Sequence, residues 1–402
     1  MSAAVDHDVI VSGAGPAGVA AAVALTRADP SFAGRVLCLD KARFPRDKPC
    51  GGGLTGHARA ALAALDLEVR VPHVPCTEGR IVYGSHARDV RLERPVDVVR
   101  RRDFDADLVA QARARGITVV EGEGLASFVV DEASRVVRVT TTGGRTLSAR
   151  VLVGADGAGS RVRRALARDG RPPLRLFQAE LQAPAGAVFG ARMVYDFSPM
   201  DDGLRGYVWL FPVAGGRINV GAMHTPTRAL SGAAIARALA RALARHGVTL
   251  PDGARGWPAW RYRRGARIAA PHVLCVGDAA GIDALTGEGI AVGLEQGPIA
   301  ARAVAHALAT RDFSFSGYAR DVRRATVGRE LALDGRLASL LYGRRLSAFW
   351  LSLVMFDEGV QRLYAARVSG SEILADRKRE LVAALGRHAI QAPARMRALS
   401  RA

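Results

Sequence analysis

A G-x-G-x-x-G segment near the N-terminus constrains the fold more than any other part of the sequence. A short apolar run rich in β-branched residues, DVIVS at residues 8–12, leads directly into Gly13-Ala-Gly-Pro-Ala-Gly18. A helical pattern rich in Ala and Val follows to about Ala28, and a second apolar run ends on Asp40. The order strand, glycine turn, helix, strand, acid raises this match above chance, and it predicts a dinucleotide site.

Each residue of this turn has an expected role. Gly13 permits the tight turn, Gly15 lets the backbone approach a pyrophosphate, and Gly18 lets the helix and the strand pack closely. Ala17 belongs to the same cofactor-binding turn. The N-terminus of the helix offers N–H groups and the positive end of its dipole to the phosphates. Asp40 is expected to accept a hydrogen bond from a ribose hydroxyl.

A second formal match lies at residues 51–56 (GGGLTG). It follows Lys48-Pro-Cys50 rather than a strand, and the proline disfavours strand pairing there. The segment is therefore interpreted as a loop, so the sequence predicts one dinucleotide-binding unit.

Composition excludes several other classes. The 402 residues suggest two or three domains. The net charge of +19 comes almost wholly from scattered arginines, and aromatic residues make up only 6%, so no nucleic-acid partner is expected. No apolar run reaches the length of a membrane span, and the four cysteines show no C-x-x-C spacing. We therefore expect no metal site and a cytoplasmic protein. The basic tail, residues 360–402, is either a solvated helical surface or a peripheral contact with anionic lipid.

The remaining pattern predicts a second layer. A buried strand is expected at residues 151–154, and longer β-type runs between about 177 and 223 indicate an antiparallel sheet. Helices are predicted at residues 231–246, from near Gly287, and from about residue 317 onward.

Three segments together resemble the FAD-dependent para-hydroxybenzoate-hydroxylase-like superfamily. They are the glycine turn with Asp40, GADGAGSRVR from Gly154, and GDAAGIDALTGEGI from Gly277. The resemblance implies FAD as cofactor, with Asp156 near the flavin and pyrophosphate and with Gly277-Asp278 at the ribityl chain.

The resemblance also implies roles for a helix and an arginine. The helix that follows Gly287 and Gly289 would point its N-terminus at the isoalloxazine, where it would stabilise the negative charge of the reduced flavin. Arg101 matches the family arginine that lies along the cofactor, with Arg100 and Arg102 as neighbouring alternatives.

Two further segments resemble geranylgeranyl and menaquinone-prenyl reductases. These are FPRDKPCGGGLT, from Phe44, and YVWLFP, from Tyr207, followed by Val-Gly at residues 220–221. The W-x-W-x-I-P motif of the related halogenases is not found, so halogenation is not expected. Two departures from the reductase pattern stand out: Ala284 replaces a proline, and Gly56-His57 replaces Pro-Arg.

Cys50 is the candidate catalytic residue, because a thiol beside Lys48 in a glycine loop could be reactive near the flavin. The alternative is a small residue packed beneath the ring system. The aromatic residues Tyr207, Trp209 and Phe211 alternate with aliphatic residues along a strand. They are expected to bind an apolar substrate on one face of a sheet, with core packing as the alternative.

Two histidines, His57 and His224, lie near the proposed site in the sequence. A surface or loop role is favoured for each, because no partner side chain is identified by the sequence. The alternative is an acid–base role.

The predicted fold is α/β, with a discontinuous Rossmann-type FAD-binding domain, an antiparallel substrate sheet and a helical C-terminus. Residues 1–75, 101–175 and 265–315 are assigned to the FAD domain, 76–100 and 176–264 to the substrate sheet, and 316–402 to the helical region.

Two flavin chemistries compete on this fold. The two departures favour a monooxygenase that hydroxylates or epoxidises a small lipophilic, prenylated aromatic substrate. It would use O₂ and electrons from NADH or NADPH, delivered directly or through a partner flavin or NAD(P)H reductase. The first alternative is a reductase of prenyl double bonds, and the second is a flavin- or lipid-binding protein without catalysis.

Overall fold

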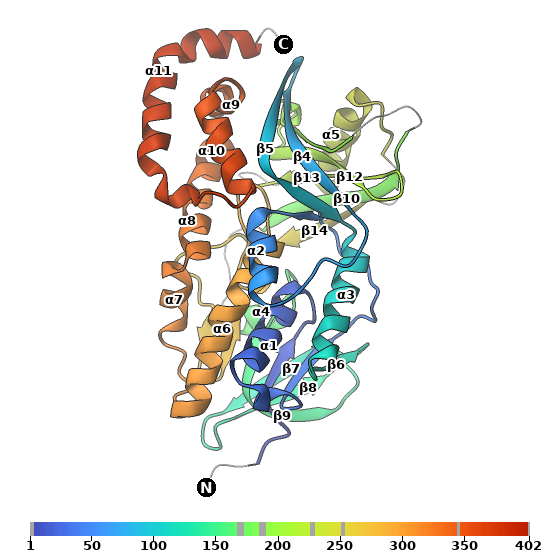
Figure 1. Ribbon diagram of the computed structural model, residues 1–402, viewed down its shortest axis with the longest axis vertical. Coiled ribbons are helices and arrows are strands. Elements are labelled where there is room, and N and C mark those ends of the chain that lie inside the picture. Colours follow the sequence, from blue (N-terminus) through green and yellow to red (C-terminus); the bar gives the residue numbers. More distant parts are fainter. Residues whose placement is uncertain are drawn as a thin grey trace.

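The glycine turn joins the first strand of a sheet to a helix, as the sequence predicts (Figure 1). The computed structural model describes residues 4–166, 173–184, 190–225, 230–250, 254–343 and 346–400. β1 (His7–Ser12) enters the turn and α1 (Pro16–Ala28) leaves it, with Pro16 in the first helical turn, where a missing N–H costs nothing. The mixed α/β class with two sheets and a helical C-terminus is confirmed.

Within the described residues the first sheet has eight strands. They are β1, β2 (Val36–Asp40), β6 (Thr118–Glu121), β7 (Leu125–Asp131), β8 (Val136–Thr141), β9 (Thr146–Gly154), β15 (Ala269–Ala270) and β16 (Val273–Cys275). β16, β9, β1, β2 and β6 are parallel neighbours in that order, while β8 and β7 extend antiparallel from the first half of β9. Parallel strands end at one edge of a sheet. The segments after β1, β2, β9 and β16 therefore meet there.

Helices cover this sheet on both sides. The helices α1, α3 (Arg101–Ala114) and α4 (Arg161–Leu166) contact its strands, whereas α6 (Ile290–Thr310) packs on α1, and α2 (Gly56–Ala64) and α7 (Tyr318–Arg324) contact α6. α6 packs directly on α1: a Cβ at Gly297 would lie 2.5 Å from Cβ of Ala20. This close approach brings the first residues of α6 beside the glycine turn.

The second sheet also has eight strands among the described residues. They are β3 (Gly53–Leu54), β4 (His73–Tyr83), β5 (His86–Val99), β10 (Leu174–Gln182), β11 (Arg192–Asp196), β12 (Gly206–Val213), β13 (Arg217–His224) and β14 (Arg255–Ala259). It is antiparallel except where β4 pairs with β11 in parallel. These two strands come from distant parts of the chain, so no hairpin dictates their relative direction.

The loop predicted at residues 51–56 is shorter than expected. Gly53–Leu54 form β3, which pairs with residues 97–98 of β5, and α2 begins at Gly56. Pro49 lies outside β3 and costs the strand no hydrogen bond. Both β3 and the start of β4 fall within the 1–75 segment assigned to the FAD domain, yet they pair in the second sheet.

The back of the second sheet is closed by α5 (Gly232–Arg245). Val208 and Leu210 of β12 pack there with Ile235 and Leu239 of α5. Alternation along the strand therefore turns Tyr207, Trp209 and Phe211 to the opposite face.

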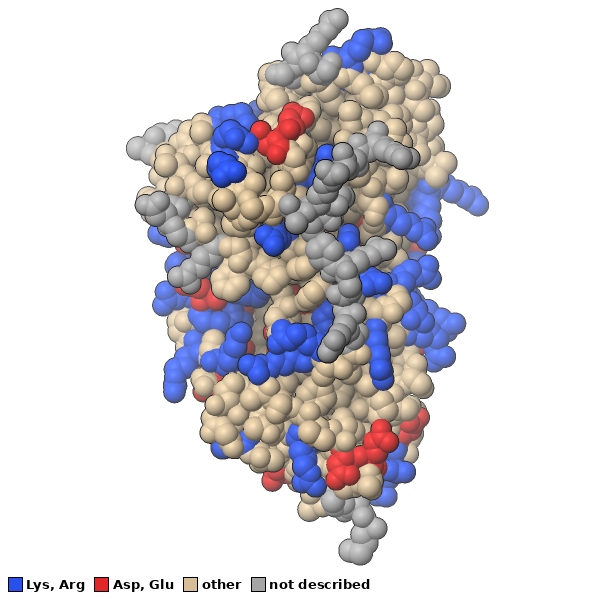
Figure 2. Space-filling view, turned by 180° about the vertical axis from the view of Figure 1, so that it is seen from behind, with Lys and Arg blue, Asp and Glu red and all other residues tan. Residues whose placement is uncertain are grey.

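The C-terminal part is helical, as predicted, in α8 (Thr326–Leu341), α9 (Ser347–Phe356), α10 (Glu358–Val368) and α11 (Lys378–Ser400). In Figure 1 these helices stand beside the second sheet, and α10 contacts both β5 and α2. None of the described helices is long and apolar enough to cross a membrane. Figure 2 shows Lys and Arg side chains across the middle and along both sides of the opposite face, interrupted by other residues.

Candidate cofactor and substrate site

The glycine turn leaves open space at one position and close contacts at two others. A Cβ at Gly13 would lie 2.2 Å from the Ala155 carbonyl oxygen, and one at Gly18 would lie 1.9 Å from the Gly13 carbonyl oxygen. These glycines let the helix, the turn and the strand approach one another. At Gly15 the nearest protein atom is an Arg46 side-chain nitrogen at 3.5 Å, so the space in front of this backbone is available to a ligand.

Asp40 holds the turn from the end of β2. Its Oδ2 accepts a hydrogen bond from the Ala14 N–H at 2.9 Å, and its Oδ1 accepts one from the Ala42 N–H at 2.9 Å. The side chain lines the cavity beside the turn. Each oxygen can accept a second bond, so a ribose hydroxyl remains a compatible partner.

Two aspartates predicted at the cofactor lie at the same edge. Asp156 accepts a hydrogen bond from the Arg161 N–H at 2.7 Å through Oδ2, while its buried Oδ1 has no partner among the described residues. Burial raises the pKa of this carboxyl. Asp278 pairs with Lys48 at 3.3 Å. An orphaned acceptor beside an open glycine turn is what a bound ligand with hydroxyl groups would satisfy.

The N-terminus of α6 completes this side of the site. Gly277 follows β16 and lies against Ala17, and its N–H donates to Oε1 of Gln296 at 2.7 Å. Gly287 and Gly289 precede α6, whose first residue is Ile290. Since Ala17, Gly287 and Gly289 all line the cavity, the free N–H groups of α6 face a position where a dipole would stabilise an anion.

Of the three neighbouring arginines, only Arg101 lines the cavity. Its guanidinium bonds Asp105 twice, at 2.8 Å each. Burial alone would lower the pKa of Arg101, but the charge of Asp105, its hydrogen bonds and the neighbouring Cys50 together outweigh burial and raise the pKa. Arg100 instead pairs with Glu180 at 2.9 Å, on the substrate sheet.

The glycine loop around Cys50 is bound to the second sheet. Nδ2 of Asn219 donates to the Cys50 carbonyl at 2.7 Å, and Nε1 of Trp209 donates to Oδ1 of Asn219 at 2.8 Å. A Cβ at Gly51 would lie 2.9 Å from the ring of Phe211. The half-buried Cys50 therefore lies between the FAD-binding edge and the aromatic strand, and it lines the cavity.

The predicted aromatic residues share one face of β12. All three line the cavity: Tyr207, Trp209 and Phe211. Tyr195 of β11 lies between Tyr207 and Phe211. The centroid of its ring is 5.5 Å from that of Tyr207 and 5.2 Å from that of Phe211. A Cβ at Gly221 would lie 2.2 Å from the Trp209 ring, so the glycine in β13 leaves the room that the indole occupies.

One cavity of about 800 Å³ joins these parts. It runs from the glycine turn past Asp278 and the N-terminus of α6 to the aromatic face of β12, and Tyr364 and Val368 of α10 close it from the C-terminal side. The residues fit FAD: an open glycine turn, an orphaned aspartate oxygen and a helix N-terminus line one continuous space. Among the described residues no group of His, Cys, Asp and Glu side chains could hold a metal ion.

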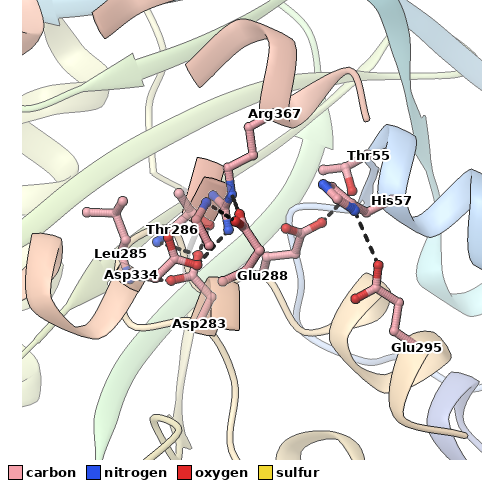
Figure 3. A network of polar contacts seen from close by, with 11 residues as sticks. Thr55, His57, Asp283, Leu285, Thr286, Glu288, Glu295, Asp334 and Arg367 are labelled. Atoms are coloured by element: carbon pink, nitrogen blue, oxygen red, sulfur yellow. Dashed lines mark hydrogen bonds and ion pairs between the residues drawn. The ribbon is translucent and has the colours of Figure 1, made fainter. Parts of the chain in front are cut away.

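Sequence reasoning missed a polar network beside this cavity (Figure 3). The buried Arg367 of α10 bonds Glu330 at 2.6 Å and Asp334 at 2.5 Å, both on α8. Glu288 accepts a hydrogen bond from the Thr55 hydroxyl at 2.5 Å. The TGEG segment, in which an acid stands between two glycines, could have indicated a functional role for Glu288. No comparable pattern surrounds Arg367, which resembles the other arginines of the basic tail.

His57 belongs to the same region. It lies on α2, mostly buried, with its Nδ1 3.2 Å from Oε1 of Glu295 on α6. The expected surface or loop role is therefore wrong for its position. Its hydrogen bond to Glu295 raises the pKa of the imidazole despite burial.

Comparison with known proteins identifies the family. Residues 6–314 match the model described as FAD binding domain. The chain belongs to this FAD-binding family. It is an FAD-dependent oxidoreductase, in agreement with the resemblance seen in its motifs.

Two curated relatives of this FAD-dependent oxidoreductase come from the expected branch. Menaquinone reductase of Mycolicibacterium smegmatis is 31% identical over 331 residues, which cover 73% of this chain and 75% of the relative. Digeranylgeranylglycerophospholipid reductase 2 of Methanopyrus kandleri is 29% identical over 325 residues, covering 77% and 80%. A geranylgeranyl bacteriochlorophyll reductase-like protein from Thermoplasma acidophilum shares the fold, with a TM-score of 0.65, 19% identity and coverage of 93% of this chain and 99% of that one.

Replacing Asp278 by Ala should weaken FAD binding without abolishing it. The carboxylate lines the cavity, and one hydrogen bond to a charged group contributes about 1.5–3 kcal/mol, so the Kd for FAD should rise roughly tenfold to hundredfold. Titration of the apoprotein with FAD, followed by flavin fluorescence, measures this. Asp278→Asn, which keeps an acceptor, should bind with intermediate affinity. An unchanged Kd in Asp278→Ala would remove this residue from the FAD site.

Proposed function

We propose that this FAD-dependent oxidoreductase saturates a carbon–carbon double bond in an isoprenoid chain. The observation that carries the proposal is the continuous cavity in which the FAD-binding edge faces Tyr207, Trp209 and Phe211. Aromatic side chains bury an apolar hydrocarbon over a large area, which is how such a surface gains binding free energy. The names of the curated relatives support the proposal, since menaquinone and digeranylgeranyl lipids both carry isoprenoid chains.

Bound FAD, reduced with electrons from NADH or NADPH, would supply the hydride. The residues of the chain bind the substrate and exclude water. The aromatic face of β12 and Val368 of α10 line the apolar part of the cavity, and Lys48 and Arg101 line the part beside the glycine turn. The cavity therefore has a charged part that suits a dinucleotide and an apolar part that suits a hydrocarbon chain.

One departure from the reductase pattern has a packing cause. A Cβ at Gly56 would lie 2.0 Å from the Ser369 carbonyl oxygen, because the end of α10 presses on the start of α2. Residue 56 is therefore glycine to accommodate the C-terminal helices. Because the packing of α10 against α2 explains the glycine at residue 56, this departure from the reductase pattern does not argue against a reductase.

A monooxygenase acting on a lipophilic, prenylated aromatic substrate is the second candidate. Ala284, in place of the reductase proline, is the observation that favours it. Ala284 is buried in the same apolar cluster as Trp209 and Tyr207, so this departure lies close to the substrate face. Both candidates use the same cofactor and the same apolar cavity.

The two candidates differ in their need for O₂. After incubation of reduced enzyme with a polyprenyl quinone under strict anaerobiosis, any quinol is reoxidised to the quinone, and mass spectrometry should then detect a quinone with two more hydrogens, which fragmentation places in the isoprenoid chain. Parallel incubation with heavy-isotope O₂ should leave that product unlabelled. A product that forms only with O₂ and carries the heavy oxygen would establish the monooxygenase instead. A colourless protein that turns over nothing would favour a lipid-binding role.

The exposed surface of α11 favours the peripheral contact with anionic lipid, which was one of the two interpretations of the basic tail. Val382 and Ile390 are exposed there, together with basic residues of the same helix. We propose contact of this helix with anionic lipid, which suits an enzyme whose substrate resides in membranes. A cytoplasmic location and a partner reductase stay predictions.

A further inference from the structure

Glu288 lies between two cavities. It lines the large cavity together with Tyr207 and Trp209, and it also lines a small chamber of about 20 Å³ behind the loop. That chamber is enclosed by α2, α6, α8 and α10. The residues around it are His57, Asp283, Glu288, Ala291, Val292, Glu295, Val327, Glu330, Leu331, Asp334 and Arg367. In Figure 3, Glu288 stands between the carboxyl cluster at Arg367 and the pair formed by His57 and Glu295.

The chamber holds more carboxyl groups than the nearby cation can neutralise. The Arg367 guanidinium donates to Glu330 and Asp334, at 2.6 and 2.5 Å. Asp283 accepts the N–H groups of Leu285 and Thr286, at 2.6 and 2.9 Å. Carboxyl groups that share a poorly solvated site cannot all ionise.

Glu288 is the acid of this group that reaches the substrate side. Burial raises its pKa, even though Arg367 and the Thr55 hydroxyl act in the opposite direction. A carboxyl whose pKa is raised and which lies beside an apolar cavity is suited to general-acid catalysis.

We propose that Glu288 is the catalytic acid that protonates the substrate, and that the small chamber restores its proton from solvent through His57 and Glu295. This assignment rests on the proposed reductase function. Bound FAD, once reduced, would supply a hydride and would be oxidised by two electrons. One alkene carbon would gain the C–H bond formed with that hydride as the π bond breaks. The O–H bond of Glu288 breaks, and its proton forms the C–H bond at the other carbon, leaving a carboxylate.

Other groups with exchangeable protons in the cavity are poorer donors. The Tyr207 hydroxyl donates to the Thr286 carbonyl at 2.5 Å, and burial raises the pKa of Tyr207 well above its ordinary range. Burial does the same to the pKa of Tyr364. The Cys50 sulfur accepts the Gly52 N–H at 3.4 Å, and thiols are ordinarily weaker acids than carboxyl groups.

The return path follows from the contacts of His57. Its Nδ1 faces Glu295, which is partly exposed to solvent, and its buried Nε2 has no partner among the described residues. A volume of about 20 Å³ is enough for one water molecule. Such a water could join Nε2 to Glu288, so a proton can pass from solvent through the imidazole to the carboxyl.

The test compares Glu288→Gln with Glu180→Gln. The amide in Glu288→Gln keeps an acceptor for Thr55 but cannot give up a proton, so saturated product should form about 10²- to 10⁴-fold more slowly, while FAD content and the rate of flavin reduction stay unchanged. Glu180 lies on the substrate sheet, pairs with Arg217 and lines no part of the large cavity, so Glu180→Gln should react as fast as the wild type. Glu288→Asp, which keeps an acid, should recover part of the rate.

A second readout does not depend on turnover. The infrared difference spectrum of wild type minus Glu288→Gln, both FAD-bound at neutral pH, should contain the band of a protonated carboxyl, because subtraction removes the bands of other buried acids such as Asp156 and Asp334. If the difference spectrum lacks this band, or if Glu288→Gln reduces the substrate at the wild-type rate, the assignment of Glu288 is overturned. If the wild type forms no saturated product while the band is present, the reductase function fails and the protonated Glu288 stands.

Discussion

A valine in place of Gly15 should yield a folded protein that retains almost no FAD. The backbone at Gly15 has φ −74° and ψ −177°, which any residue adopts, and a Cβ there meets only an Arg46 nitrogen at an ordinary 3.5 Å. The added side chain would instead fill the space between the turn and the N-terminus of α1, where the pyrophosphate is expected. The ratio of flavin to protein absorbance after purification measures the loss, and circular dichroism reports the fold.

Gly232→Val provides the matched control. Gly232 is also at a helix N-terminus, that of α5, and its Cβ would likewise meet its nearest atom at 3.5 Å, but it lies outside the large cavity. This variant should purify with full flavin. Gly18→Val should behave differently from both, because its Cβ would overlap the Gly13 carbonyl and disturb the fold itself. A Gly15→Val protein with full flavin occupancy would contradict the placement of the cofactor at this turn.

Replacing Arg367 by Met should destabilise the protein by about 3–5 kcal/mol, the usual cost of leaving buried charges without their partner. The methionine fills a similar volume but leaves Glu330 and Asp334 without a cation, and both side chains are at most 7% exposed. Urea denaturation with saturating FAD in both samples should show a lower midpoint with a similar slope.

The control for this variant is an arginine in an exposed ion pair. Arg377 bonds Glu372, but its side chain is 42% exposed, so solvent screens the pair and Arg377→Met should leave the midpoint almost unchanged. If Arg367→Met unfolds at the wild-type midpoint, the four helices around the chamber are held by apolar contacts, and the buried ion pairs contribute little.

The sequence predicted the parts of this site that are encoded by short-range pattern. The glycine turn, Asp40, the segments at Asp156 and Asp278, and the start of α6 each sit at the end of a buried strand or at a helix N-terminus. The family resemblance assigned Asp156, Asp278 and the start of α6 to the cofactor, and the shared edge of the parallel strands brings them together with the glycine turn and Asp40. Alternation alone also placed Trp209 and its two aromatic neighbours on one face.

The polar chamber could not be predicted in the same way. Thr55 and Glu288 are 233 residues apart, and His57 and Glu295 are 238 apart, so no local spacing connects them. Arg367 has no sequence feature that separates it from the other arginines of the basic tail, and its burial depends on how α8 and α10 pack. The parallel pairing of β4 with β11 could not be predicted either, because the two strands are far apart in the chain and no local pattern connects them.

The order in which the cavity residues occur along the chain has a consequence for biosynthesis. The FAD-binding edge is complete once α6, which ends at Thr310, has been synthesised and has folded, whereas Tyr364 and Val368 follow later on α10. Domains form as the nascent chain leaves the ribosome, N-terminal segments first. The growing polypeptide can therefore capture FAD while the apolar compartment is still open, and α10 then closes over a cofactor already in place.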